Sequence, residues 1–312
     1  MWTCREEREM QKRIISINEL SGAEILRIIE TASDIKRNQG RYVERLKGSV
    51  LLLLFQKTST RTRVAFELGM KRLGGSTIVM DWGRSNFSIS PIRYEARYVG
   101  SMVDVILARL LRNGDVIELA QNAGVPVING CCNMFHPSQA LADLMTVYEK
   151  KGGFSTTLAY VGVHNNVANS LYYASMKVGM NLIFVTPQRD VVPEDFGSLS
   201  GCSATFEETL DLQYAASKAE FLYTDTWINM EEFSRVGRDA EQDTKIQKLL
   251  AYQINRELVA NRDVYIMHDM PVHPGLEIDD YSINCERSLI FTQAENRLYT
   301  GQALLLHLLN AL

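Results

Sequence analysis

The stretch Ser49–Arg63, SVLLLLFQKTSTRTR, joins an apolar run to a turn crowded with hydrogen-bond donors. The run Ser49–Phe55 is short and continuous, which is typical of a strand buried on both faces of a parallel sheet. In open α/β folds, ligands bind at the carboxyl ends of strands, beside the free N–H groups of the next helix. The stretch therefore predicts an anion site, with hydroxyl groups and the Arg61 guanidinium as donors. An ordinary Ser/Thr helix cap flanked by solvated arginines is the alternative.

Short apolar runs and amphipathic stretches alternate along the chain, which predicts an α/β fold with parallel sheets. The expected strands are Ser49–Phe55, Thr77–Met80, Val103–Ala108, Val125–Ile128, Thr157–Val161, Leu182–Val185, Ala204–Phe206, Phe221–Thr224 and Val264–Met267. The expected helices are Gly22–Lys36, Arg63–Leu73, Val116–Ala123, Pro137–Lys150 and Val167–Val178. With 312 residues we expect two domains, 1–150 and 151–294. An apolar helical tail, residues 295–312, should pack back on the body of the protein.

Composition narrows the class of protein. Hydrophobic residues make up 46% of the chain and charged residues 22%, as in ordinary globular proteins. The formal net charge of -4 argues against nucleic acid or an anionic membrane as a partner. The N-terminus shows no signal-peptide core, and the run Val50–Phe55 is too short to cross a bilayer. Five cysteines without CxxC spacing indicate reduced thiols in the cytoplasm and no zinc site.

Four motifs, in order along the chain, resemble those of the aspartate/ornithine carbamoyltransferase family. Phe55–Glu67, FQKTSTRTRVAFE, resembles the family's carbamoyl-phosphate signature. His136–Asp143, HPSQALAD, resembles its HPxQxLxD motif, and Asn165–Leu171 resembles the NN(V/M)xxSL element of the ornithine branch. Ala294–Leu298, AENRL, matches the AENR segment of that branch. The resemblance thus covers essentially the whole chain, and implies the family's two α/β domains with the last helix returning to the first.

The resemblance also implies transfer of a carbamoyl group from carbamoyl phosphate to an amine, as in arginine metabolism. A neutral amine attacks the carbamoyl carbon and phosphate leaves, so neither a metal nor another cofactor is expected; positioning and electrostatic stabilisation drive catalysis. By resemblance, the phosphate is held by Ser59, Thr60, Arg61 and Thr62. The carbamoyl group would be contacted by Arg109 and His136 at its oxygen and by Gln139 at its NH₂, with Arg297 nearby. Taken alone, a surface salt bridge would account for Arg109, and a structural role for His136.

The acceptor side departs from the family pattern. The resemblance assigns Asn166 to the acceptor's carboxylate and Asp225 to its α-ammonium group. In Asp225–Met230, DTWINM, Asn229 replaces the serine of the DxWxSM pattern. His268–Pro271, HDMP, replaces HCLP, so that Asp269 takes the place of a cysteine and Met270 that of a leucine. An ionised Asp269 would favour a cationic acceptor or act on the proton of its amine, which makes ornithine or a related diamino acid the expected acceptor and aspartate an unlikely one.

A third departure lies between Asp81 and Arg97. In the family this loop reaches the site of a neighbouring subunit, which implies a homotrimer with shared sites. The best alignment puts Asn86 at that position, within Trp82–Phe87, WGRSNF, next to the carbamoyl phosphate. A simple structural turn is the alternative reading of this segment.

Other functions remain as competitors. A nucleotide-binding dehydrogenase or kinase would need GxGxxG or GxxxxGK[ST] after a strand, and neither motif occurs. A carbamoyltransferase for a different amine or a ureido compound stays open. A non-catalytic relative that keeps the fold is disfavoured because Arg61, Arg109, His136 and Gln139 are all retained.

Overall fold

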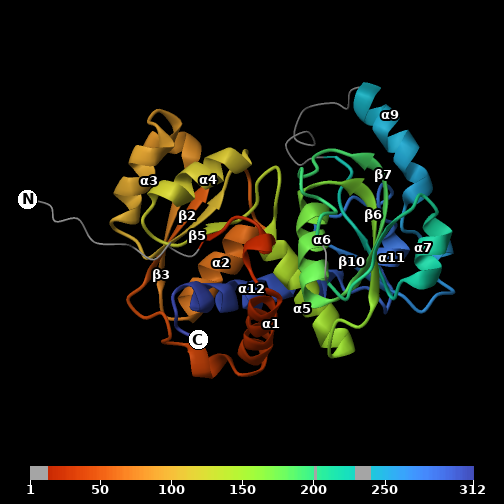
Figure 1. Cartoon of the computed structure of the whole chain (residues 1–312), viewed down its shortest axis with the longest axis horizontal. Coiled ribbons are helices and arrows are strands. Elements are labelled where there is room, and N and C mark those ends of the chain that lie inside the picture. Colours follow the sequence, from red (N-terminus) through yellow and green to blue (C-terminus); the bar gives the residue numbers. More distant parts are fainter. Residues whose placement is uncertain (1–12, 200–201, 229–239) are drawn as a thin grey trace, which may run out of the picture.

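The structure is a computed structural model that describes residues 13–199, 202–228 and 240–312. It contains two five-stranded sheets, all of whose strand pairs are parallel, side by side in Figure 1. The first sheet has the order β1-β5-β4-β2-β3 and the second β10-β9-β6-β7-β8. Each non-sequential pair of neighbours requires a crossover connection, and helices supply most of these.

The first sheet forms from runs that are apolar without interruption. All residues of β2 after its first are buried, as expected for a central strand covered on both faces. Its strands are β1 (Arg13–Ile14), β2 (Val50–Phe55), β3 (Ser76–Asp81), β4 (Val105–Arg109) and β5 (Val127–Asn129). The helices of this half are α1 (Gly22–Arg37), α2 (Arg61–Arg72), α3 (Ile92–Gly100), α4 (Asn113–Asn122) and α5 (Pro137–Lys151).

The second sheet has the same construction. Its strands are β6 (Thr157–His164), β7 (Asn181–Arg189), β8 (Phe206–Glu208), β9 (Phe221–Thr224) and β10 (Tyr265–His268). Its helices are α6 (Asn166–Val178), α7 (Leu212–Lys218), α9 (Ala240–Leu249), α10 (Arg256–Val259) and α11 (Asp280–Asn284). The two halves share one core cluster, in which α5 packs against α6.

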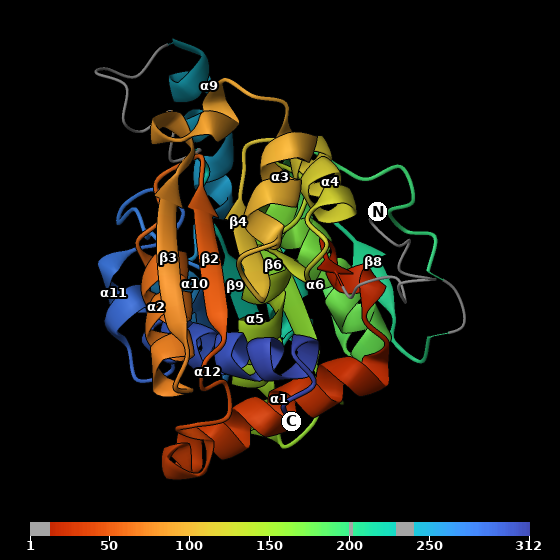
Figure 2. The ribbon, with the colours of Figure 1, turned by 90° about the vertical axis from the view of Figure 1, so that its left-hand side faces the viewer.

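Helix α12 (Ile290–Leu308) joins the halves, since it starts beside β10 and packs on α1, α2 and α5. Figures 1 and 2 show it crossing beneath the first sheet next to α1. Lys36 on α1 fixes the arrangement, because its Nζ donates to Glu149 Oε1 at 2.9 Å and to Asn296 Oδ1 at 2.7 Å. The expectation that the C-terminal helix packs back on the first half is confirmed.

The expected strands are all present; the ends of Phe221–Thr224 are as expected, and those of the other strands differ by at most four residues. The expected strand Ala204–Phe206 overlaps β8 only at Phe206, because this edge strand is three residues long and none of its residues is buried. The two-residue strand β1 and the helices α3, α7, α9, α10 and α11 were not expected. The expected boundary after residue 150 lies at the end of α5, and a division into two domains there stays a prediction. No helix in the described ranges is long and apolar enough to cross a membrane.

Strand register decides which side chains meet at the carboxyl ends. Phe55 at the end of β2 pairs with Arg109 at the end of β4, so the turn after β2 begins beside Arg109. In the second sheet, Thr224 at the end of β9 pairs with His268 at the end of β10. Asp225 and Asp269, the next residues along the chain, are therefore placed side by side.

The contact between α3 and α4 gives a test of the packing in the first half. A Cβ added to Gly100, at the end of α3, would lie 1.7 Å from the carbonyl oxygen of Ala123 beyond α4, so Gly100→Ala should lower the free energy of unfolding by at least about 1–3 kcal/mol. Gly114→Ala, whose Cβ meets nothing within 4 Å on α4, should change it little or stabilise by up to about 1 kcal/mol. Urea denaturation followed by circular dichroism measures both. Equal effects of the two substitutions would contradict the packing.

Candidate active site

A cavity lies where the carboxyl ends of the two sheets face each other. The turn after β2, the ends of β4, β9 and β10, and the first turns of α2, α5 and α6 contribute to it. It is lined by Lys57, Thr58, Ser59, Thr60, Arg61, Thr62, Arg109, Cys131, His136, Asn165, Asn166, Val167, Asp225, Thr226, Asp269, Met270, Pro271 and Arg297. Ligand sites at strand carboxyl ends beside helix N-termini are the rule for open α/β sheets.

The first half of the cavity presents donors to an anion. Helix α2 starts at Arg61, and its cap Thr60 makes no side-chain capping bond, so the helix N-terminus keeps free N–H groups. Ser59 Oγ, Arg61 Nε and Arg109 Nε are buried and have no hydrogen-bond partner. Buried donors are nearly always satisfied in proteins, so unsatisfied ones at a cavity point to a ligand that would accept from them.

The guanidinium groups of Arg109 and Arg297 converge on the hydroxyl of Thr62 at the start of α2. Arg297 Nη2 donates to Thr62 Oγ1 at 2.8 Å, and Arg109 Nη1 donates to the same oxygen at 3.4 Å. Burial, and then the nearby Arg109 and Arg61 guanidinium groups, lower the pKa of Arg297 to about 10. Clustered guanidinium groups repel one another, and a bound phosphate would remove this repulsion.

His136, the residue before α5, could donate a hydrogen bond from a neutral imidazole ring. Burial, followed by the positive charges of Arg297 and Arg109, lowers its pKa well below the ordinary value, so its ring is neutral at pH 7. Its Nδ1 lies 3.4 Å from Ser138 Oγ and its Nε2 3.5 Å from Arg297 Nη2. When Ser138 donates to Nδ1, the hydrogen is on Nε2, which can then donate to a carbonyl oxygen but no longer accept from Arg297.

Gln139 lies one turn along α5 and is fully buried, beneath the cavity rather than on its wall. Its Nε2 donates to Asp143 Oδ1 at 2.8 Å, while its Oε1 has no partner. Gln293 Nε2 also donates to Asp143 Oδ1, at 2.6 Å, and Tyr223 OH donates to Oδ2 at 3.2 Å. Burial raises the pKa of Asp143 to about 7, against the lowering effect of these hydrogen bonds.

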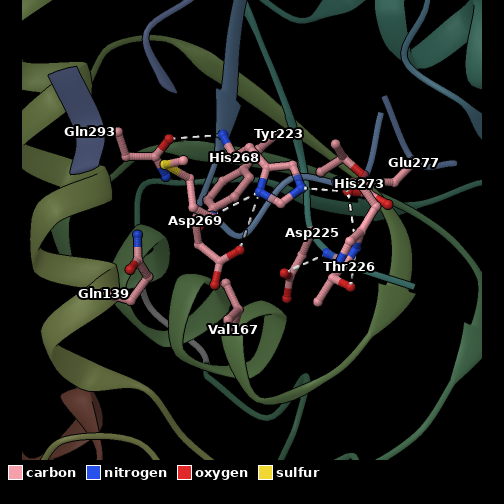
Figure 3. Close-up of polar contacts among 12 residues, drawn as sticks. Gln139, Val167, Tyr223, Asp225, Thr226, His268, Asp269, His273, Glu277 and Gln293 are labelled. Carbon is pink, nitrogen blue, oxygen red and sulfur yellow. Dashed lines mark hydrogen bonds and ion pairs between the residues drawn. The ribbon is translucent and has the colours of Figure 1, made fainter. Parts of the chain in front are cut away.

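The second half of the cavity carries two neighbouring carboxyl groups, shown in Figure 3. Asp225 is held at both oxygens, because Asn165 Nδ2 donates to Oδ2 and Thr226 N donates to Oδ1, each at 2.6 Å. Asp269 has an Oδ1 without a hydrogen-bond partner. Burial, and then the adjacent Asp225, raises the pKa of Asp269 well above the ordinary value of a carboxyl group. The raised pKa favours the protonated form of Asp269, and a cation bound beside it would favour the carboxylate.

His268 lies behind Asp269, with no exposed surface. Its Nε2 lies 3.1 Å from Glu277 Oε1, and its Nδ1 accepts from Met270 N at 2.8 Å, so the ring is fixed as the Nε2–H tautomer (Figure 3). Ligand atoms of Asp225, His268 and Asp269 lie within 4.8 Å of one another, a spacing that could hold a metal ion. Both ring nitrogens of His268 are engaged, however, so a metal would have to displace the hydrogen bond from Met270 N.

Asn166, expected to bind the acceptor's carboxylate, uses its amide group differently here. Its Nδ2 donates to Cys132 O at 2.7 Å and to Cys131 Sγ at 3.2 Å. Both amide hydrogens are thus occupied, and Asn166 would have to exchange one of these partners to hold a carboxylate.

The cavity brings together most of the residues expected from the sequence, and leaves a few aside. Asn86, at the start of the 3-10 turn Asn86–Ser88, is exposed and does not line the cavity of its own chain. Gln139 and His268 lie behind the lining. Asn229 and Met230 lie outside the described residues.

Several lining residues were not expected. Asn165 caps α6, since its Oδ1 accepts from Val167 N and Ala168 N at 3.0 and 3.2 Å, and it also holds Asp225. An asparagine just before a helical pattern is a recognisable cap, which could have identified it. Cys131 follows β5, the neighbour of β4, and its place near a strand end was the available signal.

Comparisons with known proteins agree with this geometry. Residues 12–149 match the family description "Aspartate/ornithine carbamoyltransferase, carbamoyl-P binding domain", and residues 155–308 match "Aspartate/ornithine carbamoyltransferase, Asp/Orn binding domain". The ornithine carbamoyltransferase of Archaeoglobus fulgidus is 36% identical over 305 residues, 96% of this chain and 97% of that protein. That of Bacillus thuringiensis subsp. konkukian is 37% identical over 310 residues, 95% of this chain and 94% of that protein.

Solved structures give the same result. The ornithine carbamoyltransferase from Pyrococcus furiosus has a TM-score of 0.87 at 35% identity, covering 95% of this chain and 96% of that one. The anabolic enzyme from Campylobacter jejuni has a TM-score of 0.87 at 28% identity, covering 96% of this chain and 99% of that one. With both family descriptions matched in order over nearly its full length, the chain belongs to the aspartate/ornithine carbamoyltransferase family, and is an ornithine carbamoyltransferase-like enzyme.

Proposed function

We propose that this carbamoyltransferase moves the carbamoyl group of carbamoyl phosphate onto the side-chain amine of a diamino acid, ornithine or a close homologue, and releases phosphate. The observation that carries the proposal is the division of one cavity into a cationic half and a half with two carboxyl groups. A dianionic donor suits the first half, and a cationic acceptor suits the second.

The donor is assigned to the turn at the start of α2. The unsatisfied donors Ser59 Oγ and Arg61 Nε, with the free N–H groups of the helix, match the oxygens of a phosphate group. Thr60 and Thr62 belong to the same turn. Arg109 and Arg297 approach from β4 and α12 and would share the remaining oxygens and the carbamoyl oxygen. Gln139 Oε1, buried without a partner, would accept from the carbamoyl NH₂.

The reaction then needs little beyond placement and charge. The amine nitrogen forms a bond to the carbamoyl carbon, its oxygen gains negative charge, and the bond from carbon to the phosphate oxygen breaks. Arg109 and neutral His136 stabilise the oxyanion, and the cations around Thr62 stabilise the leaving phosphate. The amine must also lose a proton, and the neighbouring carboxyl groups of Asp225 and Asp269 would take it.

The acceptor is assigned to the second half of the cavity. The Asp225–Asp269 pair would bind an ammonium group, and a second carboxylate in the same place would be repelled. Asn166, Met270 and the neighbouring residues Asn229 and Met230 would shape the pocket, with His268 holding the segment in place. A carbamoyltransferase for a simple diamine is the second candidate, because both amide hydrogens of Asn166 are already engaged and not free for a carboxylate.

We also propose that residues 1–150 with 295–312 form the carbamoyl-phosphate-binding domain and residues 151–294 the acceptor-binding domain. The family matches at 12–149 and 155–308 support a boundary near residue 150. A cytoplasmic location stays a proposal, and is supported by four described cysteines that form no disulfide.

Finally we propose a homotrimer with shared sites. Strand β3 is the edge of the first sheet, at the front of Figure 2, and its Ile78 and Val79 are 47% and 37% exposed. An exposed apolar edge strand usually pairs or is covered, and a second copy of this chain is the occupant proposed here. Asn86 follows β3 and is exposed outside its own cavity, which suits a role in a neighbour's site.

Removing one phosphate donor tests the donor half. Arg61→Ala should lower kcat/KM for carbamoyl phosphate by about 30- to 900-fold, the equivalent of about 2–4 kcal/mol for a lost transition-state donor. Arg63→Ala is the matched control, because Arg63 lies on the same helix with its Nε bound to Glu67 at 3.1 Å on the surface. A steady-state assay of ureido product measures both. Near wild-type turnover by a folded Arg61→Ala variant would refute the donor assignment.

Replacing Asp269 tests the acceptor half. Only ionised Asp269 can accept a proton, and its raised pKa means that the ionised form appears at a higher pH than for an ordinary carboxyl group. Wild-type kcat/KM should therefore fall on acidification, with a midpoint at a pH above the ordinary pKa of an aspartate. Asp269→Asn should lose at least about 100-fold in kcat and lack this midpoint, whereas the exposed Asp280→Asn should retain both.

The same assay, run on ornithine, its shorter and longer homologues, putrescine and aspartate, ranks the acceptors. We expect a diamino acid to lead and Asp269→Cys to reorder the ranking. If aspartate leads in the wild type, the cationic-acceptor proposal is wrong; if Asp269→Cys preserves the order, Asp269 does not select the acceptor.

Subunit mixing tests the shared site. Arg61→Ala and Asn86→Ala chains should each be nearly inactive, and co-refolded mixtures should regain activity because some sites then combine an intact Arg61 with a neighbour's intact Asn86. Light scattering should give about three times the chain mass of 35.3 kDa. A monomer, or a mixture as inactive as its components, would exclude shared sites.

A further inference from the structure

Asp143 connects the carbamoyl end of the cavity to its acceptor end. It lies on α5, one turn after Gln139, and is 1% exposed. Its Oδ1 accepts from Gln139 Nε2 at 2.8 Å and from Gln293 Nε2 at 2.6 Å. Gln293, on α12, in turn accepts at Oε1 from the backbone N–H of His268 at 2.9 Å, the residue before Asp269 (Figure 3). One buried carboxyl group thus joins α5, α12 and the end of β10.

The amide of Gln139 has two orientations that differ only in which atom faces Asp143. Oδ1 of Asp143 accepts from both glutamines, so the NH₂ of Gln139 turns toward Asp143 and Oε1 turns away from it. Oε1 is buried and has no partner. A fixed, unsatisfied carbonyl oxygen can accept from an NH₂ group, but it would repel a second oxygen and gains nothing from a methyl group.

We propose that Asp143 is a positioning residue that makes the site selective for a carbamoyl group over other acyl groups. It acts through Gln139, by holding the amide with Oε1 as the only atom offered to the donor's NH₂. Gln293 links this orientation to the position of β10. It donates to the same carboxyl oxygen as Gln139, and it accepts from the backbone N–H of His268 at the end of β10. The proposal rests on the proposed function for the identity of the donor and goes beyond it in naming what sets donor choice.

Acetyl phosphate is the probe that isolates this effect, since it replaces the NH₂ of carbamoyl phosphate by a methyl group and keeps the phosphate and the carbonyl oxygen. The measured quantity is the ratio of the dissociation constants of acetyl phosphate and carbamoyl phosphate, obtained by short calorimetric titrations without acceptor. Inorganic phosphate, which Gln139 does not discriminate, reports the integrity of the anion site in each variant.

Asp143→Leu keeps the volume but removes every acceptor, so the Gln139 amide loses its fixed orientation. We expect the selectivity ratio to fall at least about tenfold, while binding of inorganic phosphate changes by less than about threefold. Asp143→Asn offers a carbonyl oxygen to both glutamines and an NH₂ to the hydroxyl of Tyr223, so it should restore much of the lost selectivity. Asp143→Ala, which leaves room for water, serves the same comparison if Asp143→Leu does not fold.

Two further variants separate positioning from general packing. In a Gln139→Leu background, which lacks selectivity itself, adding Asp143→Leu should lower the ratio no further. Thr146→Val alters a buried polar residue one turn away on α5, whose Oγ1 donates to Ala142 O and accepts from Asn296, and it should leave the ratio intact.

The outcomes are distinct. Equal losses for both acyl phosphates and for phosphate in Asp143→Leu, or an additional loss in the double variant, would overturn the positioning role. The wild type could bind carbamoyl phosphate selectively and both Asp143→Leu and Asp143→Ala could keep that selectivity. This result would overturn the inference but not the proposed function. A wild type that does not bind carbamoyl phosphate would overturn the proposed function and this inference together.

Discussion

The structure depends on the balance of buried charge between the two sheets. Arg109 and Arg297 approach the start of α2 on one side of the cavity, and Asp225 and Asp269 lie on the other, and all four residues are buried. Neither set is fully compensated within its own half: the pKa of Arg297 is lowered and that of Asp269 raised. The cationic half would be stabilised by an anion and the acidic half by a cation, so two oppositely charged substrates would compensate both sets of charges at once.

Parallel sheets are what make this arrangement possible. All strand ends of one sheet point the same way, so residues far apart in sequence become neighbours at one edge. Asp225 and Asp269 are adjacent because the strands before them pair in register at Thr224 and His268. Helix α12 then brings Arg297 from the C-terminal part of the chain to Thr62, at 2.8 Å. The backbone thus holds apart charges that would neutralise each other if the side chains were free to meet.

Much of this could be predicted from the sequence, for identifiable reasons. Continuous apolar runs gave the central strands, since β2 and its neighbours are buried on both faces. The turn after β2 was recognisable because its donors are contiguous. Short or polar elements were not predicted, because β1 has only two residues and α9 has too few apolar positions to produce a clear helical period. Contacts between distant segments, such as the bond from Asn165 to Asp225, depend on how the halves pack and have no local signature.

Helix α12 has a consequence for biosynthesis. This helix comes late in the chain but packs on α1, α2 and α5 of the first half and carries Arg297. A nascent chain emerges N-terminus first, so the first sheet can form long before α12 has been synthesised. The apolar surface of α1 and α5 that α12 covers must stay exposed, or be shielded by a chaperone, until residue 308 has left the ribosome. The anion site is therefore assembled last, and an unfinished chain lacks one of its guanidinium groups.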